Sequence, residues 1–305
     1  MALRLVRALS KATRATRLAL PLPLAFAALV ASTSLGVAGC KDKAKVSEEE
    51  AKVNVKELVT LATEDVAEVE RGLPEGAKRM AATLAKEPEG AKNAPAVRSA
   101  LLKMRQQVPD LGKAKSTFFA FTDDKGIAIR NDLEQDTMAG KDVVGAYPDL
   151  KRALAGEAFV ATTGQFPGVP NPAGPDKEWV AGVPVKKDDG TLSGLLVTGW
   201  TYRRFAYHLQ ESLKRDLQDR LMREGEKGKL PVLYVFVFDK SAVYGPRGTP
   251  AVNEQVLGDL NLVDKTATGP ADGTITITDR AFGWAAGRVP KLGPDMGIVV
   301  LRSEI

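Results

Sequence analysis

Residues 179–202, WVAGVPVKKDDGTLSGLLVTGWTY, contain the clearest structural signal in the chain. Two apolar runs, 179–186 and 192–202, flank the polar residues Lys187-Asp188-Asp189-Gly190. Runs rich in β-branched and aromatic residues that meet at an Asp-Gly turn are typical of an antiparallel hairpin. The sequence therefore predicts two adjacent strands here, and the fold class depends on what lies on either side of them.

Further strands of the same sheet are predicted before this hairpin. Strand-like runs occur at 117–122, 127–130 and 158–164. A short helix is predicted over 147–155, and Gly156 is a suitable residue to end it. Residues 164–176 hold four prolines and three glycines, which indicates a stiff surface loop.

A helical lead-in is predicted over residues 47–108. Ser47-Glu48-Glu49-Glu50 matches a capping box, and apolar residues then recur at helical spacing as far as Leu73. Pro74 and Pro88 predict the bounds of a second short helix, and a third follows from Pro95. An amphipathic lead-in of this kind packs on its own domain or binds a partner helix.

The C-terminal part repeats the pattern of the first sheet after a long helix at 203–226. Five further strands are expected at 232–239, 242–245, 273–278, 281–289 and 296–303. A short helix is predicted among them at 253–260. The predicted fold class is therefore α+β: a helical lead-in followed by two antiparallel sheets joined by a long helix.

Three motifs follow the lead-in in a fixed order. They are Phe121-Thr-Asp-Asp-Lys-Gly126, the segment from Tyr147 to Gly156, and Val183-Pro184-Val185 with its Asp189-Gly190 turn. This order resembles the extracytoplasmic Cache domain, a PAS-like sensor module. The resemblance implies a first Cache/PAS-like domain with its lead-in over 47–202, the connecting helix 203–226, and a second, smaller PAS-like domain over 227–305. It also implies a small-molecule sensor that acts through a separate partner.

The first 40 residues resemble the leader of a bacterial lipoprotein. Residues 1–17 carry five basic residues and no acid, residues 18–31 are apolar, and Val37-Ala38-Gly39-Cys40 ends the segment like a lipobox. The resemblance implies a signal peptide over 1–39, lipidation of Cys40, a polar tether over 40–46 and an extracytoplasmic mature chain. The alternative is an ordinary cleaved signal in which Cys40 has no role.

The lipoprotein reading also implies a place in the cell envelope. Cys40 is the only Cys of the chain, and acyl chains on it would anchor the protein in the lipid bilayer. Lys41 follows it, where an Asp would resemble an inner-membrane retention signal, so the outer membrane is favoured over the inner one.

Charge and residue counts exclude several function classes. The net charge of +5 equals the five basic residues of the leader, so the remainder is balanced and gives no support to a nucleic-acid partner. One Cys and one His cannot form a Cys/His zinc site, and His208 lies within a predicted helix. No phosphate-binding glycine motif is present. We therefore expect no enzyme activity, no cofactor and no metal; the acidic run 131–136 fits a solvated loop better than a Ca²⁺ site.

A small-molecule pocket in the first sheet is the better functional candidate. The predicted ligand-binding residues are three aromatic residues and two arginines: Trp179, Trp200, Tyr147, Arg152 and Arg130. The rings offer contact area, and an arginine fork suits a ligand carboxylate. The alternative is that the rings are core and the arginines are surface. In that case the chain is a structural or surface-interaction envelope lipoprotein with a degenerate PAS-like fold and no ligand.

Overall fold

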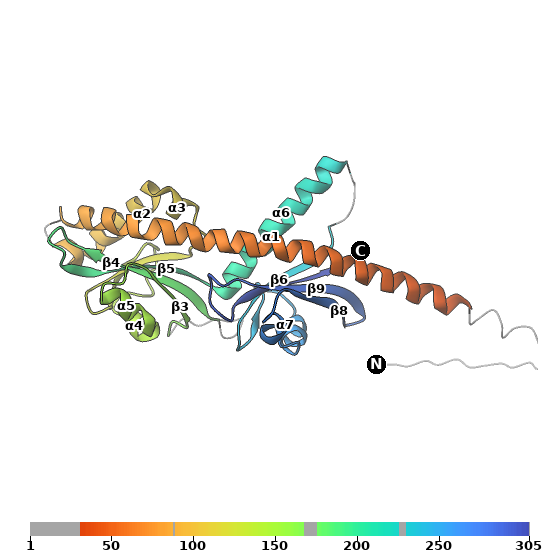
Figure 1. Cartoon of the computed structure of the whole chain (residues 1–305). Coiled ribbons are helices and arrows are strands. Elements are labelled where there is room, and N and C mark those ends of the chain that lie inside the picture. The colour runs from red at the N-terminus through yellow and green to blue at the C-terminus, as the bar shows by residue number, and fades with distance from the viewer. Residues whose placement is uncertain (1–30, 88, 168–175, 226–229, 305) are drawn as a thin grey trace, which may run out of the picture. The chain divides into compact units, whose positions relative to one another are not determined.

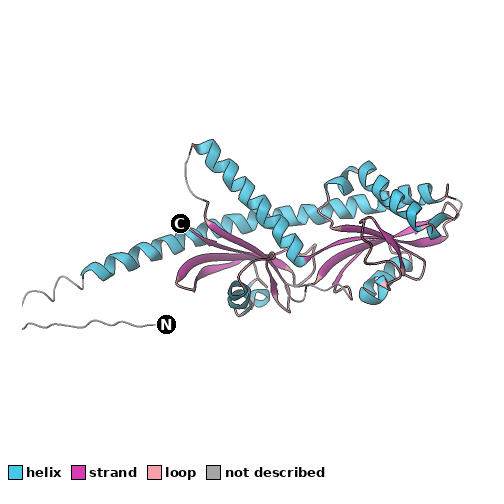
Figure 2. Ribbon diagram, turned by 180° about the vertical axis from the view of Figure 1, so that it is seen from behind, coloured by secondary structure: helices cyan, strands magenta, loops and turns pink. Residues whose placement is uncertain are grey.

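Two five-stranded antiparallel sheets form the body of the protein (Figures 1 and 2). The computed structural model describes residues 31–87, 89–167, 176–225 and 230–304, with side chains from residue 43 onward. Contacts group Lys41–Ile305 into one unit, separate from Met1–Cys40. Most of the predicted signal peptide thus lies outside the described residues. Within the described part, no helix is both long and apolar enough to cross a bilayer.

The first sheet has the strand order β2-β1-β5-β4-β3. Its strands are β1 (Phe118–Thr122), β2 (Ala128–Asn131), β3 (Val160–Gly164), β4 (Glu178–Lys186) and β5 (Leu192–Thr201). The predicted hairpin is the β4–β5 pair, in which Trp179 lies opposite Trp200. The Asp-Gly turn closes through a bond from the Gly190 N–H to the Lys187 carbonyl oxygen.

The second sheet repeats this order as β7-β6-β10-β9-β8. Its strands are β6 (Val232–Phe238), β7 (Val243–Tyr244), β8 (Ala271–Ile277), β9 (Arg280–Arg288) and β10 (Gly297–Ser303). Each sheet is therefore built by the same sequence of strands, which confirms the prediction of two antiparallel sheets with a long helix between them. That helix is α6 (Tyr202–Glu224).

Helices cover both faces of the sheets (Figures 1 and 2). Along one face lie α1 (Ala31–Leu84), α2 (Ala94–Gln107) and α3 (Pro109–Lys113), with the turn η1 (Gly90–Lys92) between the first two. On the other face the first sheet carries α4 (Val143–Ala146), η2 (Pro148–Leu150) and α5 (Lys151–Leu154). The second sheet carries α7 (Ala251–Gly258) and α8 (Leu262–Lys265) there.

The lead-in differs from its prediction, because α1 is one continuous helix through residues 40–46 and through Pro74. The predicted tether is helical since packing begins early: Ala44 is buried, and so are Ser47 and Glu48. Ser47 lies inside the helix and does not cap it. Its hydroxyl instead accepts a hydrogen bond from the Glu304 N–H at 3.1 Å. Leu73 and Ala77 are buried on either side of Pro74, so tertiary packing outweighs the one backbone hydrogen bond that proline removes.

A shared hydrophobic core runs along the α1 side of both sheets. It joins α1 residues such as Val55 and Val69 to Phe119 of the first sheet and Val300 of the second. Two smaller clusters lie on the opposite faces, one beneath α4 and α5 and one beneath α7 and α8. The predicted division into two domains, with bounds at residues 202 and 227, stays a prediction.

Candidate functional site

The two central strands of the first sheet send alternate side chains to opposite faces. On β4, Trp179 belongs to the core on the α1 side, while Val180 belongs to the cluster beneath α4 and α5. Trp200 lies on the α1 side, and Tyr147 lies on the other. The structure therefore does not bring the three predicted aromatic residues together.

Trp179 and Trp200 form a stacked core. Their ring centroids are 4.4 Å apart, and Phe205 of α6 continues the stack 4.7 Å from Trp200. The two tryptophans are 0% and 1% exposed. Neither indole N–H has a hydrogen-bond partner among the described residues. The rings thus fill the space between the sheet and the helices that cover it.

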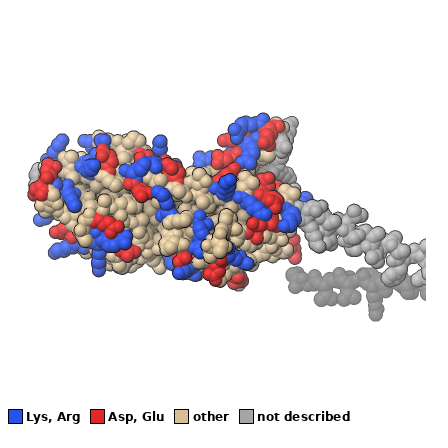
Figure 3. All heavy atoms as spheres, viewed as in Figure 1, with Lys and Arg blue, Asp and Glu red and all other residues tan. Residues whose placement is uncertain are grey.

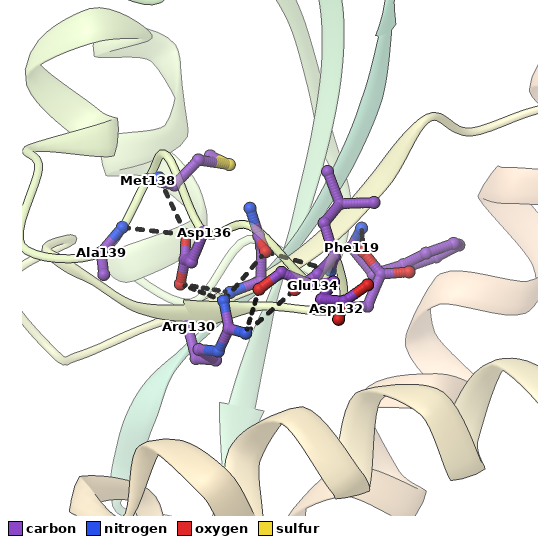
Figure 4. A network of polar contacts seen from close by, with 9 residues as sticks. Phe119, Arg130, Asp132, Glu134, Asp136, Met138 and Ala139 are labelled. Carbon is purple, nitrogen blue, oxygen red and sulfur yellow. Dashed lines mark hydrogen bonds and ion pairs between the residues drawn. The ribbon is translucent and has the colours of Figure 1, made fainter.

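Arg130 is occupied by its own loop (Figure 4). Its guanidinium forms an ion pair with Asp136 at 2.9 Å and donates to the carbonyl oxygens of Leu133 and Glu134. Burial opposes the charge of Asp136, but the Arg130 bond and backbone N–H donors, including Met138, outweigh it and lower the pKa of Asp136. Arg130 therefore orders the acidic run 131–136 and is not free to meet a ligand.

The acidic run does not form a cation site of carboxylates. Asp132 accepts a hydrogen bond from the Phe119 N–H at 2.8 Å and forms an ion pair with Arg105 at 3.1 Å. Within the described residues, no group of three or more His, Cys, Asp or Glu side chains is arranged to hold a metal. Arg152, the other predicted arginine, is exposed and pairs with Glu157 at 3.3 Å.

Tyr147 and Glu178 form a polar pair on the α4–α5 face of the first sheet. The Tyr147 hydroxyl donates to Oε2 of Glu178, which is the first residue of β4. Phe166 stacks beside Tyr147 with a centroid separation of 6.2 Å. Among the described residues, no Lys or Arg forms an ion pair with Glu178. The pair is therefore a partly buried carboxylate bonded to Tyr147, whose ring stacks on Phe166.

Two carboxylates of this end of β4 have raised pKa values. Burial is the main cause of the raised pKa of Glu178; the hydrogen bond from Tyr147 opposes it, and the charge of Asp176 adds to it. Burial likewise raises the pKa of Asp176. Burial and the nearby Glu178 charge also raise the pKa of Tyr147, so its hydroxyl stays a donor. Of the two, Glu178 is the partly buried carboxylate for which the described residues show no Lys or Arg ion pair, and such a carboxylate is suited to receive a positively charged group.

Glycines bring the backbone close to this site. A Cβ added to Gly164 would lie 2.8 Å from Cδ1 of Tyr147, and one added to Gly182 would lie 3.0 Å from Cδ2 of Leu150. Tyr147 and Leu150 thus rest directly on the sheet. The segment 168–175, which ends just before Asp176, lies outside the described residues.

The same end of β4 contacts the second sheet. Lys177, between the two carboxylates, pairs with Asp239 at 2.7 Å. Arg203, at the start of α6, forms a bidentate pair with Glu254 of α7. The Tyr202 hydroxyl lies 3.5 Å from Sδ of Met296. Glu178 is therefore the direct chain neighbour of Lys177, whose ion pair with Asp239 reaches the second sheet.

Glu178 was not among the predicted residues. It lies two residues after the predicted loop 164–176, and a charged residue at a strand end normally indicates a solvated position. Residues 178, 180 and 182 point to the same face of the sheet, which places Glu178 beside Tyr147. This could be predicted only if one knew which helices cover which face of the sheet.

No family model matches the sequence, and no curated protein matches it. Solved structures do match. One is a domain of a Vibrio parahaemolyticus protein assigned to the sensory box/GGDEF family, with 8% identity, a TM-score of 0.54, and 86% of this chain and 97% of that chain covered. Another is the extracellular domain of a protein assigned as the histidine kinase vpHK1S-Z8, with 8% identity, a TM-score of 0.53, and 88% and 93% covered.

A third match is an extracellular ligand binding receptor from Desulfohalobium retbaense, with 12% identity and a TM-score of 0.49. It covers 83% of this chain, which spans only 40% of that receptor. The two neighbours with a TM-score above 0.5 named here are a domain of a sensory box/GGDEF family protein and the extracellular domain of a histidine kinase. The helical lead-in, the repeated sheet order and the long helix between the sheets therefore give this chain the Cache/PAS-like fold of extracellular sensory domains.

Proposed function

We propose that the chain is a non-enzymatic, extracytoplasmic sensor module that binds a small molecule carrying a cationic amine. The observation that carries the proposal is the Glu178 carboxylate, partly buried, bonded to Tyr147 and without a cation partner among the described residues. An ammonium group would supply the missing charge and additional donors. The rings of Tyr147 and Phe166 would contact the apolar part of the ligand and favour the cation.

Ion pairs next to the site support a sensing role. A ligand at Glu178 would act on the neighbouring Lys177, which pairs with Asp239 of the second sheet. Binding could then change the contact between the two sheets and be read by a separate envelope signalling protein. Such a coupling needs two arrangements of the contact with different ligand affinity.

The substitution Glu178→Gln tests whether a cationic amine binds at the Glu178 carboxylate. A thermal-shift screen of the wild-type chain with putrescine, ethanolamine, 4-aminobutyrate and the common amino acids is expected to give at least one amine that raises Tm. An amine at 100 times its Kd stabilises the fold by about 2.7 kcal/mol. The shift should disappear in Glu178→Gln and persist in Asp149→Asn, whose carboxylate is exposed and already bonded to Thr162. A ligand that needs no amine, or a shift retained in Glu178→Gln, would contradict the proposal.

The same variant has a pH signature without ligand. Because burial raises the folded-state pKa of Glu178, the contribution of this group is full below its unfolded pKa of about 4.3 and is lost as pH rises through the folded value. Glu178→Gln should therefore exceed the wild type in unfolding free energy at pH 8, and this difference should shrink as the pH falls to 4. Denaturation at pH 8 and pH 4 measures the difference; a less stable variant at pH 8 would refute the assignment.

A second function is supported by the filled core. Trp179 and Trp200 pack against each other and against Phe205 instead of lining a shared pocket with Tyr147. This packing favours a structural or surface-interaction envelope lipoprotein without a ligand. The absence of any hit in a broad amine screen would favour this second function.

We further propose that Cys40 anchors the chain in the lipid bilayer, with the outer membrane favoured. Val37-Ala38-Gly39-Cys40 supports the proposal. Cys40→Ser is expected to abolish incorporation of labelled palmitate and to release the protein from the membrane fraction or leave its leader uncleaved. A Ser substitution of another small polar residue of the same region, Thr33→Ser, is the matched control. Palmitate incorporation that survives Cys40→Ser would rule the anchor out.

A further inference from the structure

A basic pocket lies where α6 passes the segment that links α3 to the first sheet. Its volume is about 510 Å³, and its wall includes residues of α2, of the 112–116 segment and of α6. Five cationic side chains line it: Arg105, Lys113, Lys115, Arg204 and Arg215. The face drawn in Figure 3, by contrast, has Lys and Arg interspersed with Asp and Glu. The pocket thus gathers mainly positive charge.

Four of these cations form no ion pair with a carboxylate in the described part of the chain. Lys113 and Lys115 form no ion pair there, and Arg204 only faces the Tyr207 ring, 5.5 Å from its centroid. Arg215 bonds to the Glu211 carbonyl oxygen and the Ser212 hydroxyl. Arg105, the fifth, is the one paired with Asp132. Arginine forks and lysines left without carboxylates can serve an external anion.

Few carboxylates lie at the pocket. Glu211, the only carboxylate in the lining, pairs with Lys214 at 3.0 Å. Asp65 is bonded to His208 at 3.1 Å, which holds that imidazole against α1. Glu68 interacts electrostatically with Lys115, and burial raises the pKa of Glu68. With five Lys and Arg side chains and one carboxylate, the described lining is positively charged.

A buried hydroxyl gives a second, independent indication. Ser116 lines the pocket, is only 6% exposed, and its Oγ has no hydrogen-bond partner among the described residues. Buried hydroxyls are normally paired, so an unpaired one beside four cations indicates a missing acceptor. Because this Oγ is itself buried, the Ser116 side chain has to rotate about its Cα–Cβ bond before the hydroxyl can donate to an oxyanion in the pocket.

We propose that this pocket binds a multivalent phosphate-type oxyanion, at a site separate from the Tyr147–Glu178 pair. Several converging cations require several negative charges on one ligand, which a monocarboxylate lacks. Tyr207, 45% exposed, adds a ring face beside Arg204 for the organic part of a phosphate ester. A second hollow of about 400 Å³ on the other side of Arg204 and Tyr207 includes Thr201, Arg203 and Arg247 and extends the site.

Calorimetry on the full chain in neutral detergent tests the proposal. Tripolyphosphate represents free phosphates, and dihexanoyl phosphatidic acid, a phosphate monoester that can carry two negative charges, represents a lipid headgroup. The double variant Lys113→Gln/Lys115→Gln should weaken binding about tenfold at low salt, since it removes two exposed charges. Glu211→Gln should tighten binding, because it removes the carboxylate of the lining. Wild-type affinity should fall as salt rises.

Arg223→Gln is the matched control, because Arg223 is an exposed residue of the same α6 helix outside this pocket. It should leave affinity unchanged, and so should Glu178→Gln, which separates this site from the proposed sensor site. Binding of either probe with this pattern supports the site and names the source of the phosphate. Binding of neither probe, or equal loss in Arg223→Gln, would overturn the proposal; unchanged melting curves of the Lys variants verify that they fold.

Discussion

Trp200→Ala is expected to lower the free energy of unfolding by about 3–5 kcal/mol, the range for removing a buried aromatic side chain. Trp200 is 1% exposed and stacks between Trp179 and Phe205, so it joins the hairpin of the first sheet to α6. Its loss would leave a cavity at the point where three elements meet. Urea denaturation followed by circular dichroism measures the effect.

Tyr207→Ala is the matched control for this experiment. Tyr207 is an aromatic residue of the same helix, but it is 45% exposed and contacts mainly Arg204. It should cost no more than about 0.5 kcal/mol. If Trp200→Ala were tolerated as well as Tyr207→Ala, the tryptophan pair would not be a packed core, and the role of ligand contact would return to it.

Gly283→Ala is expected to destabilise the protein by about 2–4 kcal/mol and to loosen the start of α1. A Cβ at this position of β9 would lie 2.0 Å from the backbone N of Glu48 and 2.2 Å from the carbonyl carbon of Ser47. These are backbone atoms of α1, so no side chain can move aside. Hydrogen exchange should show lost protection over residues 44–66, and denaturation should show the lower stability.

Gly258→Ala provides the comparison. Gly258 ends α7, and no atom lies within 4 Å of the Cβ that alanine would add. That substitution should be neutral, or stabilising by about 0.5 kcal/mol, because alanine restricts the unfolded chain more than glycine does. Equal effects of the two substitutions would show that the close approach of β9 and α1 does not limit the fold.

The sheets could be predicted because side-chain alternation and the Asp-Gly turn are determined by residues that are close in sequence. The helical lead-in could be predicted only in part, because contacts between residues far apart in sequence determine its length. A capping box at Ser47 and a proline at 74 are local stop signals, but the helix is held by contacts with distant strands, such as that of Ser47 with Glu304. A window of about ten residues contains no information on such contacts, so the sequence pattern does not predict how far the helix extends.

The candidate site was predictable only in part. Tyr147 was identified, whereas Trp179 and Trp200 lie on the opposite face of the same sheet. Strands covered by helices on both faces have no polar side, so their sequence does not distinguish one face from the other. Arg130 pairs with Asp136, six residues further along the chain. The sequence alone does not distinguish an arginine that binds a ligand carboxylate from one that binds a carboxylate of its own loop.

The docking of α1 on the second sheet has a consequence for the order of synthesis. Arg302 of β10 donates to Asn54 across 248 positions of the chain, and Val55 shares its core with Ile298 and Val300. Contacts so distant in sequence form slowly and late. The part of the α1 stripe that contacts the second sheet, around Val55, must therefore stay uncovered until β10 (residues 297–303) has left the ribosome. A nascent chain stalled before residue 297 would be exposed to aggregation and to chaperones during that time.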